Sequence, residues 1–166
     1  MNIIIQSTLK TLSKSQILLD NLTDEIFCNS TVSPYYSSLG SHIRHILDFY
    51  GCILNVNLDS EIDLTARSRN RAIESECTRA RQYLNLIIDA LTTFECDMND
   101  SILVCDDLGL GKVKMTYTYG ALFSQANSHT IHHYAIINYI LEGLNISIND
   151  PDFGYNPTTP KQTSLN

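Results

Sequence analysis

The stretch over residues 122–143, LFSQANSHTIHHYAIINYILEG, carries a helical repeat that decides the fold class. Residues spaced alternately by four and three positions fall on one face of a helix. That face comprises Leu122, Ala126, His129, His133, Ile136, Ile140 and Gly143. Thr118 is a suitable N-cap residue just ahead of it. We therefore expect a helix from Thr118 to about Gly143 with this face turned toward a core.

The same periodicity predicts three earlier helices, over about residues 7–28, 37–55 and 68–94. The second has two neighbouring stripes that together form a broad inward face. The stripes are Leu39, Ile43, Ile46, Tyr50 and Ile53, and His42, His45, Phe49 and Cys52. Residues 56–66 show no helical period and are expected to form a connection.

Between the last two helices the pattern changes to two β-prone runs around a glycine-containing turn, which predicts a hairpin. The runs are Ser101–Cys105 and Lys112–Tyr117. Residues 149–166 are rich in turn-forming types, and Phe153 and Tyr155 favour packing of this tail on the rest. We therefore expect a mainly all-α fold: a four-helix bundle over residues 1–148 with a small β-hairpin between helices three and four. The turn-rich tail over residues 149–166 is expected to pack on the bundle or to be partly frayed.

Composition excludes several classes of function. The 166 residues carry a net charge of -7 with no basic block, so nucleic acid and anionic membranes are unfavourable partners. No window approaches the ~18 apolar residues of a spanning helix, and the N-terminus lacks the basic region of a signal peptide. The five cysteines are scattered and odd in number, which indicates reduced thiols. We expect a cytoplasmic protein.

All five histidines fall in two short windows, a clustering that folding does not require. His129 and His133 lie one helical turn apart, at positions where the repeat calls for apolar residues. Buried imidazoles need polar partners or a metal. His45, on an inward stripe of the second helix, supplies a third ring. Three such nitrogen donors suit Zn²⁺, Ni²⁺ or Fe²⁺, while the alternative is hydrogen-bonded core histidines without a metal.

Other polar residues near these histidines are candidates for supporting roles. His42 and His132 each lie three residues from a proposed ligand, so each is an alternative ligand, a group beside the ligands, or a surface residue. Asp48, three residues after His45, is placed to accept a ring N–H of that ligand, or is simply a solvated charge.

A further polar cluster lies at the start of the third expected helix, with Arg67, Arg69, Arg71 and Glu74. The arginines are candidates to bind a substrate carboxylate or phosphate. Glu74 and Asp48 are candidate catalytic proton acceptors. The alternative is that Arg71 and Glu74 pair with each other as neighbours on the helix.

The chain resembles the DinB/YfiT-like family of metalloenzymes. Ser38–Asp48, SLGSHIRHILD, resembles the first ligand motif of that family, and Ser128–Ala135, SHTIHHYA, resembles its His-x-x-x-His motif. The resemblance extends to Ala66–Asn70 and to Asp152–Thr159, so with the helical layout it covers most of the chain. It implies a four-helix bundle, often dimeric, with His45, His129 and His133 on a divalent metal.

Some members of this family are transferases or isomerases that use low-molecular-weight thiols. The resemblance therefore implies a metal-dependent enzyme acting on a small molecule, most plausibly a thiol-dependent transferase, with a homodimer as the expected assembly. Two alternatives stay open, because a fold does not determine an activity. One is a non-catalytic, stress-associated metal-binding protein, and the other is a metal-dependent hydrolase.

Overall fold

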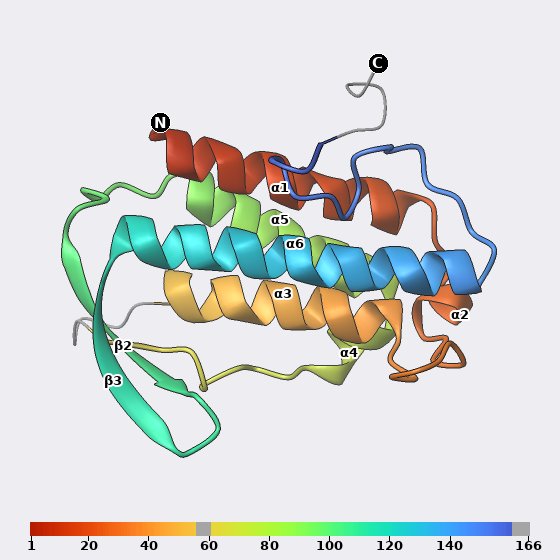
Figure 1. Ribbon diagram of the computed structural model, residues 1–166, viewed down its shortest axis with the longest axis horizontal. Helices are drawn as coiled ribbons and strands as arrows, with labels where there is room; N and C mark the ends of the chain where they lie inside the picture. Colours follow the sequence, from red (N-terminus) through yellow and green to blue (C-terminus); the bar gives the residue numbers. More distant parts are fainter. Residues whose placement is uncertain (56–60, 161–166) are drawn as a thin grey trace.

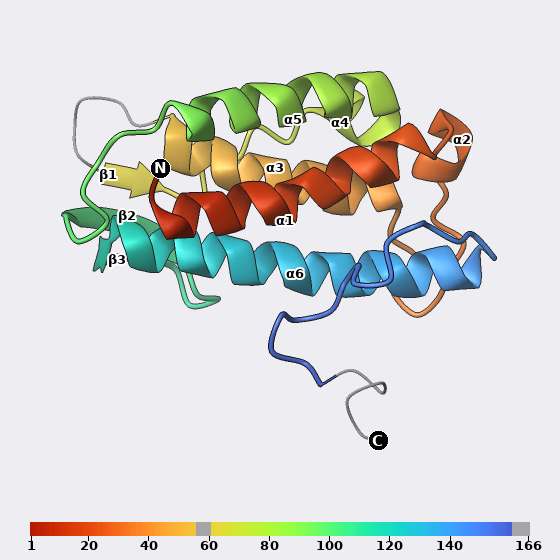
Figure 2. The ribbon, with the colours of Figure 1, turned by 90° about the horizontal axis from the view of Figure 1, so that it is seen from above.

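The computed structural model describes residues 1–55 and 61–160, and its long helices run side by side (Figures 1 and 2). They are α1 (Ile3–Asp20), α3 (Leu39–Leu54), α5 (Cys77–Thr92) and α6 (Tyr119–Gly143). Both α1 and α3 pack against α5 and α6, so the core lies between these helices. None of the helices in the described residues is long and apolar enough to cross a membrane.

Side-chain caps fix where the two helices that carry the histidines begin. The Ser38 hydroxyl accepts a hydrogen bond from the Ser41 backbone N–H at the start of α3. The Thr118 hydroxyl accepts one from the Ala121 N–H at the start of α6, which confirms the predicted N-cap. The predicted apolar stripe of α3 is confirmed too, because all five of its side chains are completely buried: Leu39, Ile43, Ile46, Tyr50 and Ile53.

A mixed sheet of three strands lies at one end of the helices (Figure 1). Strand β2 (Ser101–Asp107) pairs antiparallel with β3 (Lys112–Thr118), as the predicted hairpin requires. Strand β1 (Glu61–Asp63) adds to the other edge of β2 in parallel. From β1 the chain continues along α3, which brings residues 64–70 against the histidine-bearing helix.

The prediction of a four-helix bundle with one small hairpin is wrong. Over the residues that the structure describes, the chain forms six helices and a three-stranded mixed sheet, although it is mainly helical. The third strand was missed because three residues are too few to show a period of two. Its pairing partner is also a distant segment that local pattern does not reveal. Of the connection expected over 56–66, residues 56–60 lie outside the described part of the chain.

Two of the expected helices are each divided. The first, expected over 7–28, becomes α1 and the short α2 (Asp24–Phe27), because the Thr23 side chain caps a new helix by accepting from Ile26 N–H. The third, expected over 68–94, becomes α4 (Arg71–Ser75) and α5, because Glu76 adopts an extended conformation between them. The stripe of apolar residues thus continues across the interruption between two helices.

The buried face of α6 differs from the predicted stripe in a way that matters for the site. Its central buried line passes through Ala126, Thr130, Tyr134 and Ile137, while His129 and His133 lie beside it and are half-buried. Leu122, Ala126 and Ile140 of the predicted stripe are buried, so it is the two histidines between them that turn toward the neighbouring helix. The histidines therefore leave the core and reach the seam between α6 and α3.

The C-terminal tail contacts the helices as far as the structure describes it. The buried Phe153 ring lies on Tyr134, with 4.7 Å between the ring centroids, and Lys14 forms a 2.7 Å ion pair with Asp150. Residues 161–166, which belong to the tail expected over 149–166, lie outside the described residues. The division of the chain at residue 148 stays a prediction.

Candidate metal centre

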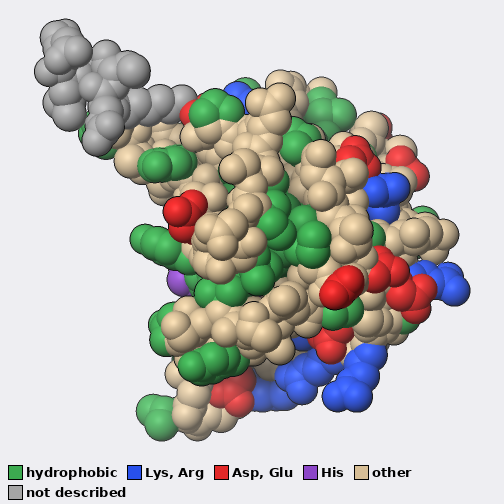
Figure 3. All heavy atoms as spheres, turned by 90° about the vertical axis from the view of Figure 1, so that its right-hand side faces the viewer, with side chains coloured by type: hydrophobic (Ala, Val, Ile, Leu, Met, Phe, Trp, Pro, Cys, Tyr) green, Lys and Arg blue, Asp and Glu red, His purple; other side chains and the backbone are tan. Residues whose placement is uncertain are grey.

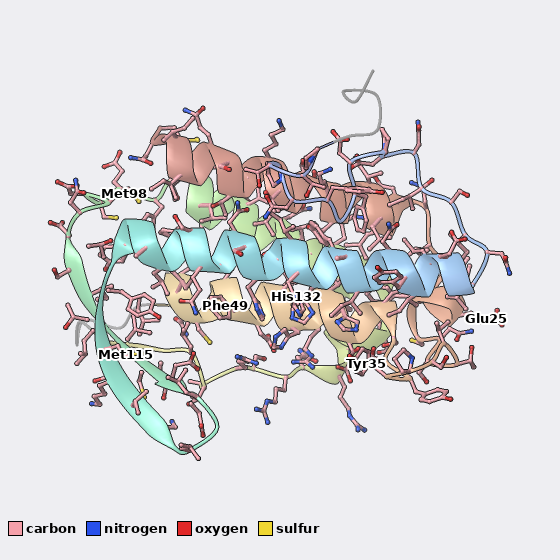
Figure 4. All side chains as sticks on the ribbon, viewed as in Figure 1. Glu25, Tyr35, Phe49, Met98, Met115 and His132 are labelled. Carbon is pink, nitrogen blue, oxygen red and sulfur yellow. The ribbon has the colours of Figure 1, made fainter. Side chains whose placement is uncertain are left out.

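Three imidazoles meet where α3 and α6 pack against each other. His45 comes from α3, and His129 and His133 come from successive turns of α6. Each offers one ring nitrogen, and these nitrogens all lie within 4.8 Å of one another. Figure 4 shows imidazole rings gathered between the ribbons of the two helices, around the labelled His132.

This donor set fits a divalent ion. Nitrogens bound about 2.1 Å from one tetrahedral ion lie about 3.4 Å apart, so small side-chain rotations suffice to close the cluster around an ion. Imidazole nitrogen is a donor that Zn²⁺, Ni²⁺ and Fe²⁺ all accept. The three-histidine cluster could therefore hold a metal, as the spacing in the sequence predicts.

Burial keeps these rings in the neutral form that binds metals. It lowers the pKa of His45 to about 4, with the charge of Arg67 as the next cause. Burial also lowers the pKa of His133 to about 2, helped by the neighbouring histidines, and it lowers the pKa of His129. Near pH 7 all three rings are thus unprotonated at one nitrogen, and protons compete weakly with a metal.

His45 lies between an arginine and a histidine. Arg67 donates from its guanidinium to His45 Nδ1 at 3.1 Å and, from Nε, to the Leu64 carbonyl. Because a guanidinium can only donate, Nδ1 is the acceptor, and the proton of neutral His45 sits on Nε2. That Nε2–H donates to His129 Nε2 at 2.9 Å. An ion bound at Nε2 would require the proton on Nδ1, and Arg67 would then have to turn away from His45.

A second chain of contacts supports His133. Its Nδ1 lies 2.9 Å from His42 Nδ1, and His42 Nε2 lies 2.8 Å from the Ser37 hydroxyl. Two proton arrangements satisfy these three groups, and in the one that suits metal binding His133 Nδ1–H donates to His42 while His42 Nε2–H donates to Ser37. His133 Nε2 is then free to bind a metal, and its ring orientation is fixed from behind.

The structure places the two remaining histidines differently. His42 touches a candidate ligand directly, whereas His132 is exposed and its ring centroid lies 5.2 Å from that of His133 and 6.4 Å from that of His129. The three-residue metal cluster contains neither of them. In this arrangement both lie beside the candidate ligands.

Asp48 and Glu74 belong to an ion-pair network beside the histidines. Arg44 donates to Asp48 Oδ2 at 3.1 Å and to Glu74 Oε2 at 3.0 Å, and the Arg69 backbone N–H also donates to Asp48 Oδ2. Asp48 thus accepts the hydrogen bonds described for it from Arg44 and Arg69, while His45 Nδ1 contacts Arg67. Within the described residues, Asp48 Oδ1 is buried without a hydrogen-bond partner. Catalytic roles for both carboxylates stay predictions.

The three arginines of the predicted substrate-binding cluster separate in space. Arg67 alone contacts a candidate metal ligand. Arg69 and Arg71 have exposed side chains, and Glu74 pairs with Arg44 rather than with Arg71 as the local alternative proposed. The sequence placed these residues within five positions of one another, but only one of them faces the centre.

Arg44, Ser37 and Phe49 were not singled out from the sequence. The centroid of the Phe49 ring lies 5.0 Å from the centroid of the His129 ring, so Phe49 limits where that imidazole can move. Arg44 could have been found from its spacing of four residues to Asp48, which is typical of helical ion pairs. Phe49 shares the predicted inward stripe of His42 and His45, which could have indicated its place at the site, whereas nothing in the sequence separates Ser37 from ordinary loop residues.

The sequence was also compared with known proteins. No protein-family model matches the chain, and no curated protein shows significant similarity to it. These comparisons therefore assign neither a family nor an activity to the chain.

Proposed function

We propose that this protein is a divalent-metal-dependent transferase that uses a low-molecular-weight thiol as co-substrate, with His45, His129 and His133 as the metal ligands. The observation that carries the proposal is the cluster of three imidazole nitrogens within 4.8 Å. The resemblance of the two histidine motifs to the DinB/YfiT-like family supports the choice of reaction. The homodimer expected from the same resemblance stays a prediction.

The chemistry follows from the neutral donors. A divalent ion held only by imidazoles keeps its full charge and lowers the pKa of a thiol or water bound to it. The chain contributes by keeping the three imidazoles neutral through burial and by fixing the orientation of His133 through His42 and Ser37.

The thiols of the chain are poor candidates for the nucleophile. Burial raises the pKa of Cys52 to about 11 and that of Cys77 to about 12, and it also raises the pKa of the exposed Cys28. At neutral pH these groups are protonated, and only a thiolate is an efficient nucleophile. This favours a thiol supplied by a separate small molecule.

Arg67 is the residue best placed to orient an anionic co-substrate. Its guanidinium contacts His45 and would be released from that contact by an ion bound at His45 Nε2. A freed guanidinium beside the centre can then pair with a carboxylate of the thiol compound. Asp48 and Glu74 already pair with Arg44, so His42 and His132 are better placed to move a proton.

The test uses protein purified without an affinity tag and loaded with Co²⁺, whose visible absorption reports its ligands. A thiol such as cysteine or glutathione should change the spectrum in a saturable way, and the change should disappear in His129→Ala. A hydrolase would instead turn over esters or amides without any thiol. A protein that holds Co²⁺ but shows neither behaviour would contradict the proposal and favour a binding function.

A further inference from the structure

A cleft opens on the surface beside the histidine cluster, between α6 and the loop that joins α2 to α3. It has a volume of about 580 Å³, which lies within the range of pockets that hold small molecules. Its walls are Val32 and Pro34 of the loop, and Ile136 and Ile140 of α6. Figure 3 shows this side of the molecule, with a histidine visible at the left edge of the view next to hydrophobic side chains.

The described lining of the cleft offers no carboxylate, ammonium or guanidinium group as an ion-pair partner. Apart from its apolar walls it consists of serine, tyrosine and histidine, and none of the described residues that line it is Asp, Glu, Lys or Arg. A charged group buried here would lose its hydration without gaining such a partner, whereas an apolar body would lose nothing.

Three polar side chains of the lining connect the cleft to the candidate metal ligands. His42 and Ser37, which support His133, are both part of the lining, and so is His132. A molecule in the cleft is therefore one side chain away from His133. Two exposed tyrosines line the same cleft, Tyr35 from the loop and Tyr139 from α6. Aromatic rings at these positions can cover a flat apolar molecule.

We propose that this cleft binds an uncharged, largely apolar small molecule and presents it to the neighbouring three-histidine centre as the second substrate; this rests on the proposed function. A described lining without Asp, Glu, Lys or Arg, a volume matched to a small molecule, and apolar walls from the loop and α6 together select this class. An anionic thiol would instead be held on the opposite flank, where Arg67 contacts His45.

The test measures binding of N-phenyl-1-naphthylamine, an uncharged fluorescent probe, at pH 8 to the full chain with EDTA present. The chain has no tryptophan, so background fluorescence is low. Its sulfonated relative, 1-anilinonaphthalene-8-sulfonate, has the same rings and a negative charge. We expect one neutral probe per chain, bound at least fivefold more tightly than the anionic one.

Variants then locate the probe. Ile136→Gln should weaken binding of the neutral probe at least fivefold, while Ile88→Gln, at a partly buried isoleucine of α5 outside the cleft, should not. Tyr139→Glu should act like Ile136→Gln and is safe for folding, since Tyr139 is 78% exposed. Its control is Leu108→Glu on the hairpin turn, at a residue that is 68% exposed. Unchanged binding in both cleft variants would overturn the proposal.

Metal measurements separate this proposal from the proposed function. The cleft variants should bind Co²⁺ like the parent protein, and the neutral probe should alter the Co²⁺ spectrum of the parent but not of Tyr139→Glu. If Co²⁺ does not bind at all while the probe does, the metal function fails and the substrate assignment fails with it. If probe binding falls as the protein self-associates in sedimentation experiments, a second copy covers the cleft and the proposal is overturned.

Discussion

Replacing His133 with alanine should remove most of the stabilisation that a metal gives this protein, while replacing the adjacent His132 should not. His133 supplies one of the three clustered nitrogens, and His132 is exposed and outside the cluster. The two substitutions are matched, because the residues are neighbours on the same helix and identical in chemistry.

The magnitude follows from linkage between binding and folding. At a metal concentration of about 100 times the dissociation constant, the bound ion stabilises the fold by about 2.7 kcal/mol. Removing a group that merely supports a ligand costs about 10- to 100-fold in affinity, so loss of a ligand should cost at least about 100-fold. At the same metal concentration the variant would then gain only about 0.4 kcal/mol. For a chain of this size, losing about 2.3 kcal/mol of metal stabilisation reduces the metal-induced rise in melting temperature by about 5–9 °C.

The assay is thermal unfolding of each protein with Zn²⁺ and with EDTA, and the quantity compared is the metal-induced shift within each variant. Any effect of His133→Ala on the metal-free fold cancels in this comparison. The reasoning would be refuted by a full metal-induced shift in His133→Ala, or by an equal loss of that shift in His132→Ala.

Three further outcomes follow from the contacts at and below the site. Arg67→Gln should tighten Zn²⁺ binding about tenfold in calorimetric titration, because a charged hydrogen bond to His45 worth about 1.5 kcal/mol no longer has to break; unchanged affinity would count against the described proton arrangement. The free energy of unfolding of the metal-free protein, measured in urea, should fall as the pH falls from about 6.5 to 4, because the unfolded chain binds protons that folded His45 and His133 exclude. The dependence of this free energy on pH should be weaker in the H45Q/H133Q variant. Tyr134→Phe should cost about 1–3 kcal/mol in urea unfolding, since it leaves the buried Ser15 hydroxyl without its 2.6 Å partner; a change below about 0.5 kcal/mol would contradict this.

Local features of the fold were predictable from the sequence because they depend on neighbouring residues. The helix over 119–143 follows from its repeat and from the Thr118 cap, and the hairpin follows from two β-prone runs around glycines. The i,i+4 spacing of His129 and His133 guaranteed that a helix would bring these two rings together. That His45 joins them was a hypothesis, since spacing says nothing about which helices become neighbours.

One of the two breaks in the helices could also have been found locally. Thr23 is a favoured N-cap residue inside the helix predicted over residues 7–28, whereas no side-chain cap marks the start of α5 at Glu76. Apolar periodicity alone hid the Thr23 signal, because it continues through a change in direction when both pieces pack on the same core.

The amino-acid sequence by itself determined the approximate extents of the long helices and of the hairpin, the apolar face of α3, and that five imidazoles fall in two windows. Only the tertiary structure decided that β1 pairs with β2, that Arg67 rather than Asp48 contacts His45, and that His42 stands behind His133. It also decided that the histidines of α6 lie beside the core rather than within it. The physical reason is one of range. Caps and periodicity act over a few residues of one segment, whereas these contacts join segments remote in sequence, whose relative placement is set by how the whole core packs.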